Sequence, residues 1–398
     1  MALRIMTIYG TRPEAIKVAP IIKAIDAAPD LENVIVVTGQ HREMLDQVNT
    51  MFGIVPHHDL NIMSNGQTLN EVIAKVIMGV DRVLEQQQPD AVIVQGDTSS
   101  VMGAAVAAFN RKVPVIHLEA GLRSGDIHSP FPEEANRKLT SQITSLHLAP
   151  TATSKDNLKR EAISESSIVV TGNSVIDTLK FATENLEVHF EDQRLERLQR
   201  ERFAGTGGKI LLVTAHRREN LGAKMEEIGR AVADLARKYP SLTIVFPIHK
   251  NPKVRRSITP AVAGIDNVLL IEPLAYAEFT RMLSISDLVL TDSGGVQEEA
   301  PSLGKPVLVM RESTERPEAV VAGTVKLIGT HQKRLVDEVS LLLDSEDAYA
   351  GMANAVNPYG DGRAAERTLQ AIAWKFQGGE EPLGFDAASP LRPAARVS

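Results

Sequence analysis

Short apolar runs rich in valine and isoleucine recur along the chain, and the segments between them are long enough for helices. Typical runs are VIVV at 34–37 and AVIV at 91–94. Continuous apolar runs of this length suit strands that are buried on both faces of a parallel sheet. The predicted strands are 4–9, 33–38, 91–95, 113–118, 209–213, 242–246, 267–271, 287–291 and 306–310.

The segments between these strands indicate the architecture. Helical patterns at 67–88 and 224–238, for example, separate neighbouring strands. Strands that alternate with helices predict an α/β fold, here an open and doubly wound parallel sheet with helices on both faces.

The alternation breaks near 173–208, where charged helical segments and several glycines precede a fresh strand. We place a domain boundary there and predict two Rossmann-like, doubly wound domains with a central cleft, over 1–172 and 173–360. The helical segment 361–376 is a candidate to pack back on the first domain. The end of the chain, 378–398, is rich in glycine, proline and alanine and is predicted to be a disordered tail.

Composition and charge exclude several classes of function. With 43 Lys and Arg against 50 Asp and Glu the net charge is -7, so the broad basic footprint of a nucleic-acid-binding protein is absent. The absence of cysteine excludes disulfides, thiolate zinc sites, iron–sulfur clusters and a cysteine nucleophile. No run approaches the roughly 18 apolar residues of a membrane span, and no signal peptide is visible. We therefore expect a cytoplasmic protein that binds neither nucleic acid nor membrane.

Two turns carry the pattern of an anion site. The run TDSGG at 291–295 follows a predicted strand and opens a helix, which directs unpaired backbone N–H groups into the turn. An ordinary βα turn has the same composition, but ligands of α/β proteins bind at such strand ends. After the first strand, Arg12 and Lys17 are either cations that reach an anion or solvated surface charges.

Three carboxylates fall at the ends of predicted elements. Asp97 and Glu119 each follow a predicted strand, and Glu133 stands in the first turn of a helix that prolines precede. Arg137 lies one turn further on, at i,i+4 from Glu133. Each carboxylate alone would be an N-cap or a surface charge, but three at matching ends of adjacent elements predict an acid–base set.

A cationic cluster follows the first strand of the second half. His216 adjoins Arg217 and Arg218, a set that could face a diphosphate, although a single histidine is more often structural. His249 is a second candidate. No set of residues has metal-ligand spacing, and neither the dinucleotide fingerprint G-x-G-x-x-G nor a P-loop occurs. We therefore expect no metal and no redox cofactor.

Taken together, these motifs resemble those of the non-hydrolysing bacterial UDP-N-acetylglucosamine 2-epimerase family, from about residue 4 to about residue 376. The motifs that carry the resemblance are TRPE (11–14), HLEAGLR (117–123), PEEANR (132–137), TAHRREN (214–220) and DSGGVQEEAP (292–301). The resemblance implies a glycosyltransferase-B-like fold and a homodimer. It also implies interconversion of UDP-N-acetylglucosamine (UDP-GlcNAc) and UDP-N-acetylmannosamine (UDP-ManNAc), which supplies a nucleotide sugar for cell-envelope polysaccharides.

Carried over motif by motif, the resemblance implies roles for individual residues. Asp97, Glu119 and Glu133 resemble the catalytic acids, with His216 close to the diphosphate. The residues that resemble substrate ligands are Arg12, Lys17, Arg137, Phe279, Ser293, Gly294, Gly295, Glu299 and Arg316.

Some members of that family have a second, regulatory UDP-GlcNAc site beside the active site. The candidate residues for such a site here are Gln40, His41, Arg217 and His249. Glu43 and Gly66 depart from the Gln and Arg that those members carry, while Gln40 and His41 match.

The chemistry of the substrate restricts the route. C2 of the sugar bears an acetamido group and no adjacent carbonyl, so direct deprotonation gives an unstabilised carbanion, and an oxidation–reduction route needs a cofactor. Elimination remains: a base removes the C2 proton as UDP leaves, and UDP adds back to 2-acetamidoglucal after protonation on the other face. Which acid serves which face does not follow from the sequence. The alternatives are a hydrolysing epimerase that releases ManNAc and UDP, a UDP-sugar glycosyltransferase of the same fold, and a sensor that leaves UDP-GlcNAc unchanged.

Overall fold

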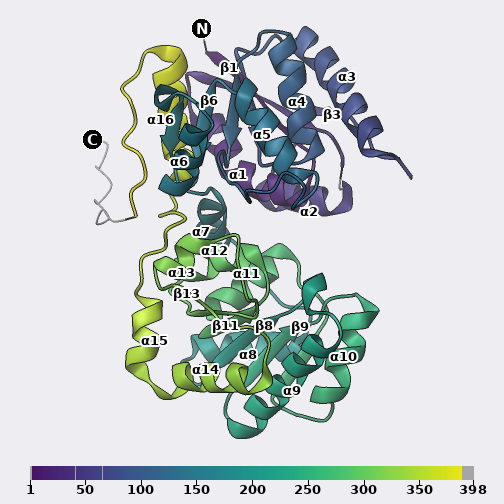
Figure 1. Cartoon of the computed structure of the whole chain (residues 1–398), viewed down its shortest axis with the longest axis vertical. Helices are drawn as coiled ribbons and strands as arrows, with labels where there is room; N and C mark the ends of the chain where they lie inside the picture. The colour runs from purple at the N-terminus through teal and green to yellow at the C-terminus, as the bar shows by residue number, and fades with distance from the viewer. Residues whose placement is uncertain (1, 41, 65, 388–398) are drawn as a thin grey trace. The chain divides into compact units, whose positions relative to one another are not determined.

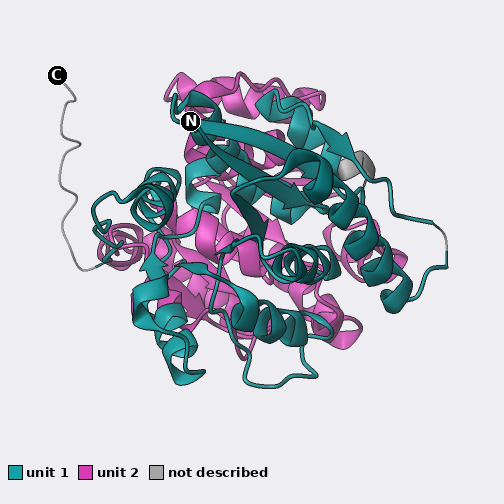
Figure 2. Cartoon of the chain, turned by 90° about the horizontal axis from the view of Figure 1, so that it is seen from above, with its two compact units in different colours: residues 1–178, 359–398 teal, residues 179–358 magenta. Residues whose placement is uncertain are grey.

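The chain divides into two compact units, each built around one parallel sheet (Figure 1, Figure 2). The residues described by the computed structural model are 2–40, 42–64 and 66–387. Unit 1 comprises residues 1–178 and 359–398, and unit 2 comprises residues 179–358. The predicted α/β fold is thereby confirmed.

Unit 1 contains a sheet of seven parallel strands in the order β3-β2-β1-β4-β5-β6-β7. Its strands are β1 (Leu3–Tyr9), β2 (Leu31–Val37), β3 (His58–Asp59), β4 (Ala91–Gln95), β5 (Val115–Leu118), β6 (Leu146–Ala149) and β7 (Ile168–Val170). Its helices are α1 (Arg12–Ala27), α2 (Arg42–Phe52), α3 (Leu69–Gln87), α4 (Ser99–Asn110), α5 (Glu133–Ile143), α6 (Ala152–Arg160), the start of α7 (Val175–Asn185) and α16 (Ala364–Gln377).

The central strands of unit 1 are covered on both faces. Met6 and Ile8 of β1 belong to a buried core that includes residues of α3 and α4. Tyr9 donates from its hydroxyl to Oδ1 of Asn49 in α2 at 2.8 Å, and α2 packs against α1. Because side chains of a strand alternate between the two faces of a sheet, two helical layers bury every position of β1 beyond its first residues.

The strand order of unit 1 reverses between β1 and β4. The chain runs from β1 outward to β2 and β3, and from β4 outward to β5, β6 and β7. In an open α/β sheet, the loops that follow the two strands at such a reversal diverge and leave a crevice for a ligand. The loops at this point are residues 10–11 after β1 and residues 96–98 after β4.

Unit 2 contains a sheet of six parallel strands in the order β10-β9-β8-β11-β12-β13, which reverses between β8 and β11. Its strands are β8 (Ile210–Thr214), β9 (Thr243–Pro247), β10 (Val268–Ile271), β11 (Leu288–Thr291), β12 (Val307–Val309) and β13 (Val325–Leu327). Its helices are the rest of α7, α8 (Gln193–Phe203), α9 (Ala223–Lys238), α10 (Pro252–Val262), α11 (Tyr276–Ile285), α12 (Gly294–Ser302), α13 (Pro317–Val321), α14 (Gln332–Asp344) and α15 (Glu346–Ala353).

The division between the units falls within α7 and not at the 172/173 boundary proposed from the sequence. Ser174 Oγ donates to the backbone oxygen of Lys17 at 2.7 Å, and Thr178 Oγ1 donates to that of Ile16 at 2.5 Å. These bonds tie the start of α7 to α1 and hence to unit 1.

The C-terminal part of the chain returns to unit 1, where α16 packs against α1. The predicted disordered tail lies outside the described residues from 388 onward. Before that point it lies along unit 1 without helix or strand: the N–H of Phe385 donates to the Val170 oxygen at 2.6 Å, and the Arg367 guanidinium lies 5.4 Å from the Phe385 ring centroid. Within the described part of the chain, no helix has the length and apolar character to cross a membrane.

Candidate functional site

A buried carboxylate fixes the loop between β1 and α1. Glu14 is only 2% exposed, and its Oε2 accepts the N–H groups of Gly10 at 2.6 Å and Thr11 at 3.0 Å. Its Oε1 accepts a bond of 2.5 Å from the Thr98 hydroxyl in the loop after β4. Burial raises the pKa of Glu14 to about 7, against the lowering effect of these bonds. Glu14 therefore holds the two loops of the strand reversal together.

Asp97 lies in the loop after β4 and is held by α5. Its Oδ2 accepts bonds from Arg137 at 2.6 Å (Nη2) and 2.9 Å (Nε), and its backbone oxygen accepts a bond of 2.9 Å from Asn136. Arg137 also pairs at 2.9 Å with Glu134, whose side chain is fully buried. Arg137 thus binds Asp97 and Glu134 and not Glu133, because the i,i+3 carboxylate is the one that faces inward from the helix.

Glu119 follows β5 with a backbone φ of 61°. This left-handed conformation is uncommon for a residue with a side chain, and such residues cluster at functional sites. Lys17 of α1 pairs with Oε1, Gln95 donates to Oε2 at 2.5 Å, and Asn173 donates to Oε1 at 3.4 Å. Lys17 therefore pairs with a predicted catalytic acid in the free protein, and three donors hold the Glu119 carboxylate in place.

The structure brings Asp97 and Glu119 to one edge of the sheet, because β4 and β5 are neighbours. A methyl group added to Gly96 would lie 3.7 Å from Glu119 Oε2, so this carboxylate lies next to the residue that precedes Asp97. Glu133 is half-buried at the start of α5, and Arg12 is half-buried at the start of α1. Neither side chain has an ion pair or hydrogen bond with any other residue that the structure describes.

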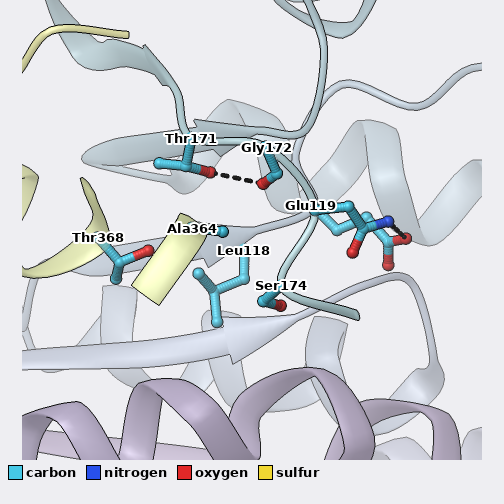
Figure 3. A pocket seen from close by; sticks show the side chains of 8 residues that line it. Leu118, Glu119, Thr171, Gly172, Ser174, Ala364 and Thr368 are labelled. Carbon is cyan, nitrogen blue, oxygen red and sulfur yellow. Dashed lines mark hydrogen bonds between the residues drawn. The ribbon is translucent and has the colours of Figure 1, made fainter. Parts of the chain in front are cut away.

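A small cavity lies behind Glu119, between the end of β5, the segment 171–174 and α16 (Figure 3). Its volume is about 10 Å³, which is the space of one water molecule and far less than a sugar needs. Thr368 Oγ1 of α16 is buried there without a hydrogen-bond partner among the described residues. The start of the C-terminal helix therefore lines the same small cavity as Glu119.

In unit 2, Asp292 organises the loops at the strand reversal. It is fully buried after β11, and its carboxylate accepts the N–H groups of His216 at 3.0 Å and Arg217 at 2.9 Å. Asn220 adds a bond of 3.1 Å, and His216 Nδ1 lies 3.2 Å from Asp292 Oδ1. A carboxylate at Nδ1 orients the imidazole and leaves Nε2 for a ligand.

His216 and His249 lie side by side, with ring centroids 6.0 Å apart and planes inclined by 24°. Burial lowers the pKa of His216; Asp292 opposes this effect, whereas Arg217 and His249 reinforce it. His216 is therefore neutral at pH 7 in the free protein, and an anionic ligand would favour its protonation.

The predicted anion turn forms the start of α12. Ser293 is the N-cap and makes no capping bond with its side chain. A methyl group added to Gly294 would lie 2.7 Å from Nη1 of Arg316, so the turn allows the guanidinium to approach closely because residue 294 is glycine. Arg316 is oriented by Glu298 of α12, which accepts from Nε at 2.6 Å. Gly295, by contrast, is exposed with open space around it.

The other predicted ligands lie on helices of unit 2: Phe279 is half-buried on α11, and Glu299 is 8% exposed on α12. Of the candidates for a regulatory site, Gln40 accepts a bond of 2.8 Å from Ser100 in unit 1, and His41 lies outside the described residues. Arg217 and His249 lie beside His216 in unit 2. A regulatory site remains a prediction.

Sequence reasoning did not assign Gln95, Asn173, Asp292 or the buried role of Glu14. Gln95 and Asp292 carry a detectable signal, because each stands at the end of a predicted strand beside a predicted site residue. Asn173 has no such signal, since only tertiary packing brings it to Glu119, 54 positions away. Within residues 2–40, 42–64 and 66–387, no group of three or more His, Asp or Glu side chains could hold a metal ion.

Comparisons with known proteins agree with one another. The family model described as UDP-N-acetylglucosamine 2-epimerase matches residues 23–373. A curated UDP-N-acetylglucosamine 2-epimerase from Yersinia pestis is 49% identical over 370 residues, which cover 93% of this chain and 98% of that protein. A crystal structure of UDP-GlcNAc 2-epimerase from Neisseria meningitidis bound to UDP-GlcNAc is 45% identical, with a TM-score of 0.82 over 94% of this chain and 100% of that one.

A more distant likeness concerns the fold alone. The glycosyltransferase SnogD from Streptomyces nogalater is 15% identical, with a TM-score of 0.60 over 94% of this chain and 100% of that one. The glycosyltransferase-B-like architecture is therefore shared with proteins of other activities. The family model and the relatives that match over nearly their full length show more than the fold. The chain belongs to the UDP-N-acetylglucosamine 2-epimerase family.

Proposed function

We propose that this protein interconverts UDP-GlcNAc and UDP-ManNAc by elimination and re-addition of UDP, without a cofactor. The observation that supports this proposal most directly is the pair of carboxylates, Asp97 and Glu119, on neighbouring strand ends of unit 1. Arg137 orients the first carboxylate and Lys17 the second. Inversion at C2 needs two proton-handling groups, one for each face of the sugar.

In the proposed reaction, one carboxylate takes the C2 proton while the C1–O bond breaks and its electron pair leaves with UDP. The intermediate is 2-acetamidoglucal, which carries a C1–C2 double bond. A second acid then delivers a proton to the other face of C2, and the β-phosphate oxygen of UDP attacks C1. We propose Asp97, Glu119 and Glu133 as the proton-handling set and leave the face of each unassigned.

The negative charge that develops on UDP requires fixed donors. Unit 2 supplies the N-terminus of α12, Arg316 and His216, which lie around the loops that follow β8 and β11. A diphosphate there would draw a proton onto His216, because a nearby negative charge favours the imidazolium form. We propose further contacts from Arg12 and Lys17 to phosphate, from Arg137 to substrate, and from Phe279 and Glu299 to the nucleoside.

Proton NMR of UDP-GlcNAc mixed with the pure protein tests this function against its alternatives. The proposal predicts intact UDP-ManNAc with no acceptor added. Free ManNAc and UDP would indicate a hydrolysing epimerase, and unchanged UDP-GlcNAc would leave a glycosyltransferase or a sensor.

We also propose a homodimer in the cytoplasm. Three large apolar side chains are exposed on helices that pack next to one another: Met78 on α3 (59%), Phe109 on α4 (55%) and Leu139 on α5 (57%). Exposed apolar side chains on neighbouring helices are candidates for an interface between copies. Light scattering should give the mass of a dimer for the wild type and a smaller mass for Phe109→Glu.

A further inference from the structure

Three arginines of unit 2 converge on one carboxylate that belongs to none of the sets above. Glu315, in the loop between β12 and α13, accepts bonds from Arg311 at 2.7 Å, Arg316 at 2.8 Å and Arg217 at 3.2 Å. Arg311 bonds to Oε2, whereas Arg316 and Arg217 bond to Oε1. One oxygen of Glu315 therefore faces the two arginines that adjoin the proposed diphosphate position.

That oxygen also lies at the start of α12. A methyl group added to Gly294 would lie 2.8 Å from Glu315 Oε1, next to the Arg316 guanidinium. Burial alone would raise the pKa of Glu315, but the charges of Arg316 and Arg311 lower it to about 2, so the side chain is an anion at neutral pH. An anion that lies beside a helix N-terminus and bonds to two arginines has the surroundings that a phosphate group takes.

We propose that Glu315 is a resident counter-anion of the diphosphate position: its carboxylate occupies this position in the free protein, and the diphosphate of UDP or of the substrate displaces it from Arg217 and Arg316. The inference rests on the proposed function, in which a diphosphate binds at the start of α12. The displaced carboxylate keeps a partner, because Arg311 bonds its other oxygen and is itself anchored by Glu219 at 2.8 Å.

A resident anion has two consequences for the site. It pairs with Arg217 and Arg316 when no ligand is bound, which keeps the two cations in place. It also lowers the net affinity for a diphosphate, because binding must first break ion pairs that already exist. Glu315 thereby weakens the hold of the protein on UDP and favours release of the nucleotide.

Titration calorimetry with two probes, UDP and inorganic pyrophosphate, tests the inference on the wild type, Glu315→Gln and Glu219→Gln. Both substitutions remove one negative charge beside Arg311, but only Glu315 contacts Arg217 and Arg316. We expect Glu315→Gln to bind both probes roughly fivefold more tightly, the scale of one or two partly exposed ion pairs. Glu219→Gln should stay within about twofold of the wild type.

Equal or weaker pyrophosphate binding by Glu315→Gln would overturn the inference, because Glu315 would then preorganise the arginines and not compete for them. If pyrophosphate behaves as expected while UDP fails to bind, the counter-anion role stands and the proposed function fails. If the wild type binds neither UDP nor pyrophosphate, both the counter-anion role and the proposed function fail. Should Glu315→Gln not fold, Glu315→Asp retracts the charge by one methylene and should also bind pyrophosphate more tightly than the wild type; equal or weaker binding would again overturn the inference.

Discussion

At the scale of single residues, the carboxylates proposed to move protons are already paired in the free protein. Arg137 holds Asp97, while Lys17, Gln95 and Asn173 hold Glu119. These partners fix the direction of each carboxylate before the substrate arrives, as a group that must meet a substrate proton requires. A glutamine or asparagine side chain in place of either carboxylate has no negative charge, so it cannot form the same ion pair with Lys17 or Arg137.

We therefore predict that Glu119→Gln and Asp97→Asn each lower kcat by about 10²–10⁴-fold while UDP affinity changes little. Steady-state kinetics and calorimetry with UDP measure the two quantities. Asp81→Asn is the matched control, because Asp81 also pairs with an arginine, Arg111, but on the surface of α3. A parallel loss of UDP affinity with kcat unchanged would make these binding residues and would move the acid–base role elsewhere.

A second residue-scale prediction concerns Glu14 and the pH dependence of stability. Burial raises its pKa from 4.5 to about 7 in the folded protein. The stability that Glu14 contributes is thus fully present below pH 4.5 and is lost as the pH rises through 7, on the order of 3 kcal/mol in all. Glu14→Gln removes this titration, so the difference in melting temperature between wild type and variant should shrink from pH 5 to pH 8.

Glu71→Gln is the control for Glu14. Glu71 holds the equivalent capping position of α3, accepting the N–H of Thr68 at 2.7 Å, but it is exposed and its pKa is lowered, first by that bond. Its contribution is therefore lost only below pH 4.5, and Glu71→Gln should run parallel to the wild type between pH 5 and 8. A constant gap between Glu14→Gln and the wild type would contradict the assignment.

At this scale the sequence predicts which residues belong to the site better than it predicts their ion-pair and hydrogen-bond partners. Asp97 and Glu119 could be selected because each follows an apolar run, and strand ends are where α/β sites form. The Lys17–Glu119 pair could not be predicted, since the two residues are 102 positions apart and only the β1–β4–β5 arrangement brings them together. Glu315 carries no motif at all, and its three arginines come from two separate loops.

At the scale of elements, the loop after β1 depends on close packing. Gly10 faces the buried hydroxyls of Thr38 and Ser100, which bond to each other at 2.9 Å. A methyl group added at Gly10 would lie 1.9 Å from Thr38 Oγ1 and 2.8 Å from Ser100 Oγ. This contact sets the position at which α1 begins, and with it the positions of the side chains in the first turns of α1.

We predict that Gly10→Ala destabilises the protein by about 1–3 kcal/mol, because overpacking a buried turn forces its neighbours apart. The melting temperature should fall by several degrees. Gly351→Ala, in α15, is the control: nothing lies within 4 Å of the added methyl group, and alanine is the better helix former. Equal effects of the two substitutions would contradict the close contact at Gly10.

Every predicted strand occurs, and no end differs from its predicted position by more than two residues. The strands that sequence analysis missed are β3, β6, β7 and β13, which have two to four residues each. Runs so short give no periodicity, and β6 (LHLA) contains a histidine that reads as polar. His147 is nevertheless buried there, with Nε2 3.0 Å from the backbone oxygen of Ser141 and Nδ1 3.2 Å from that of Ser167.

At the scale of the whole molecule, the proposed chemistry divides between the two units. The carboxylates proposed to handle protons belong to unit 1, and the groups proposed for the departing diphosphate belong to unit 2. Each set includes residues of a loop at the strand reversal of its own sheet, Asp97 in unit 1 and His216 in unit 2, which is why the same α/β pattern, repeated along the chain, predicts both sets. The fold alone is compatible with several activities, so the proposed activity depends on the resemblance to the epimerase family.

The central claim is that C2 loses and regains a proton while UDP is detached, and turnover in deuterated water tests it most directly. NMR and mass spectrometry of UDP-GlcNAc incubated with the pure protein in deuterated water report the hydrogen isotope at C2. The carboxylates proposed as proton carriers exchange with solvent, so we predict deuterium at C2 of both UDP-GlcNAc and UDP-ManNAc. Epimerised product that retains only the original hydrogen at C2 would contradict the account and would require a route in which that hydrogen never reaches an exchangeable group.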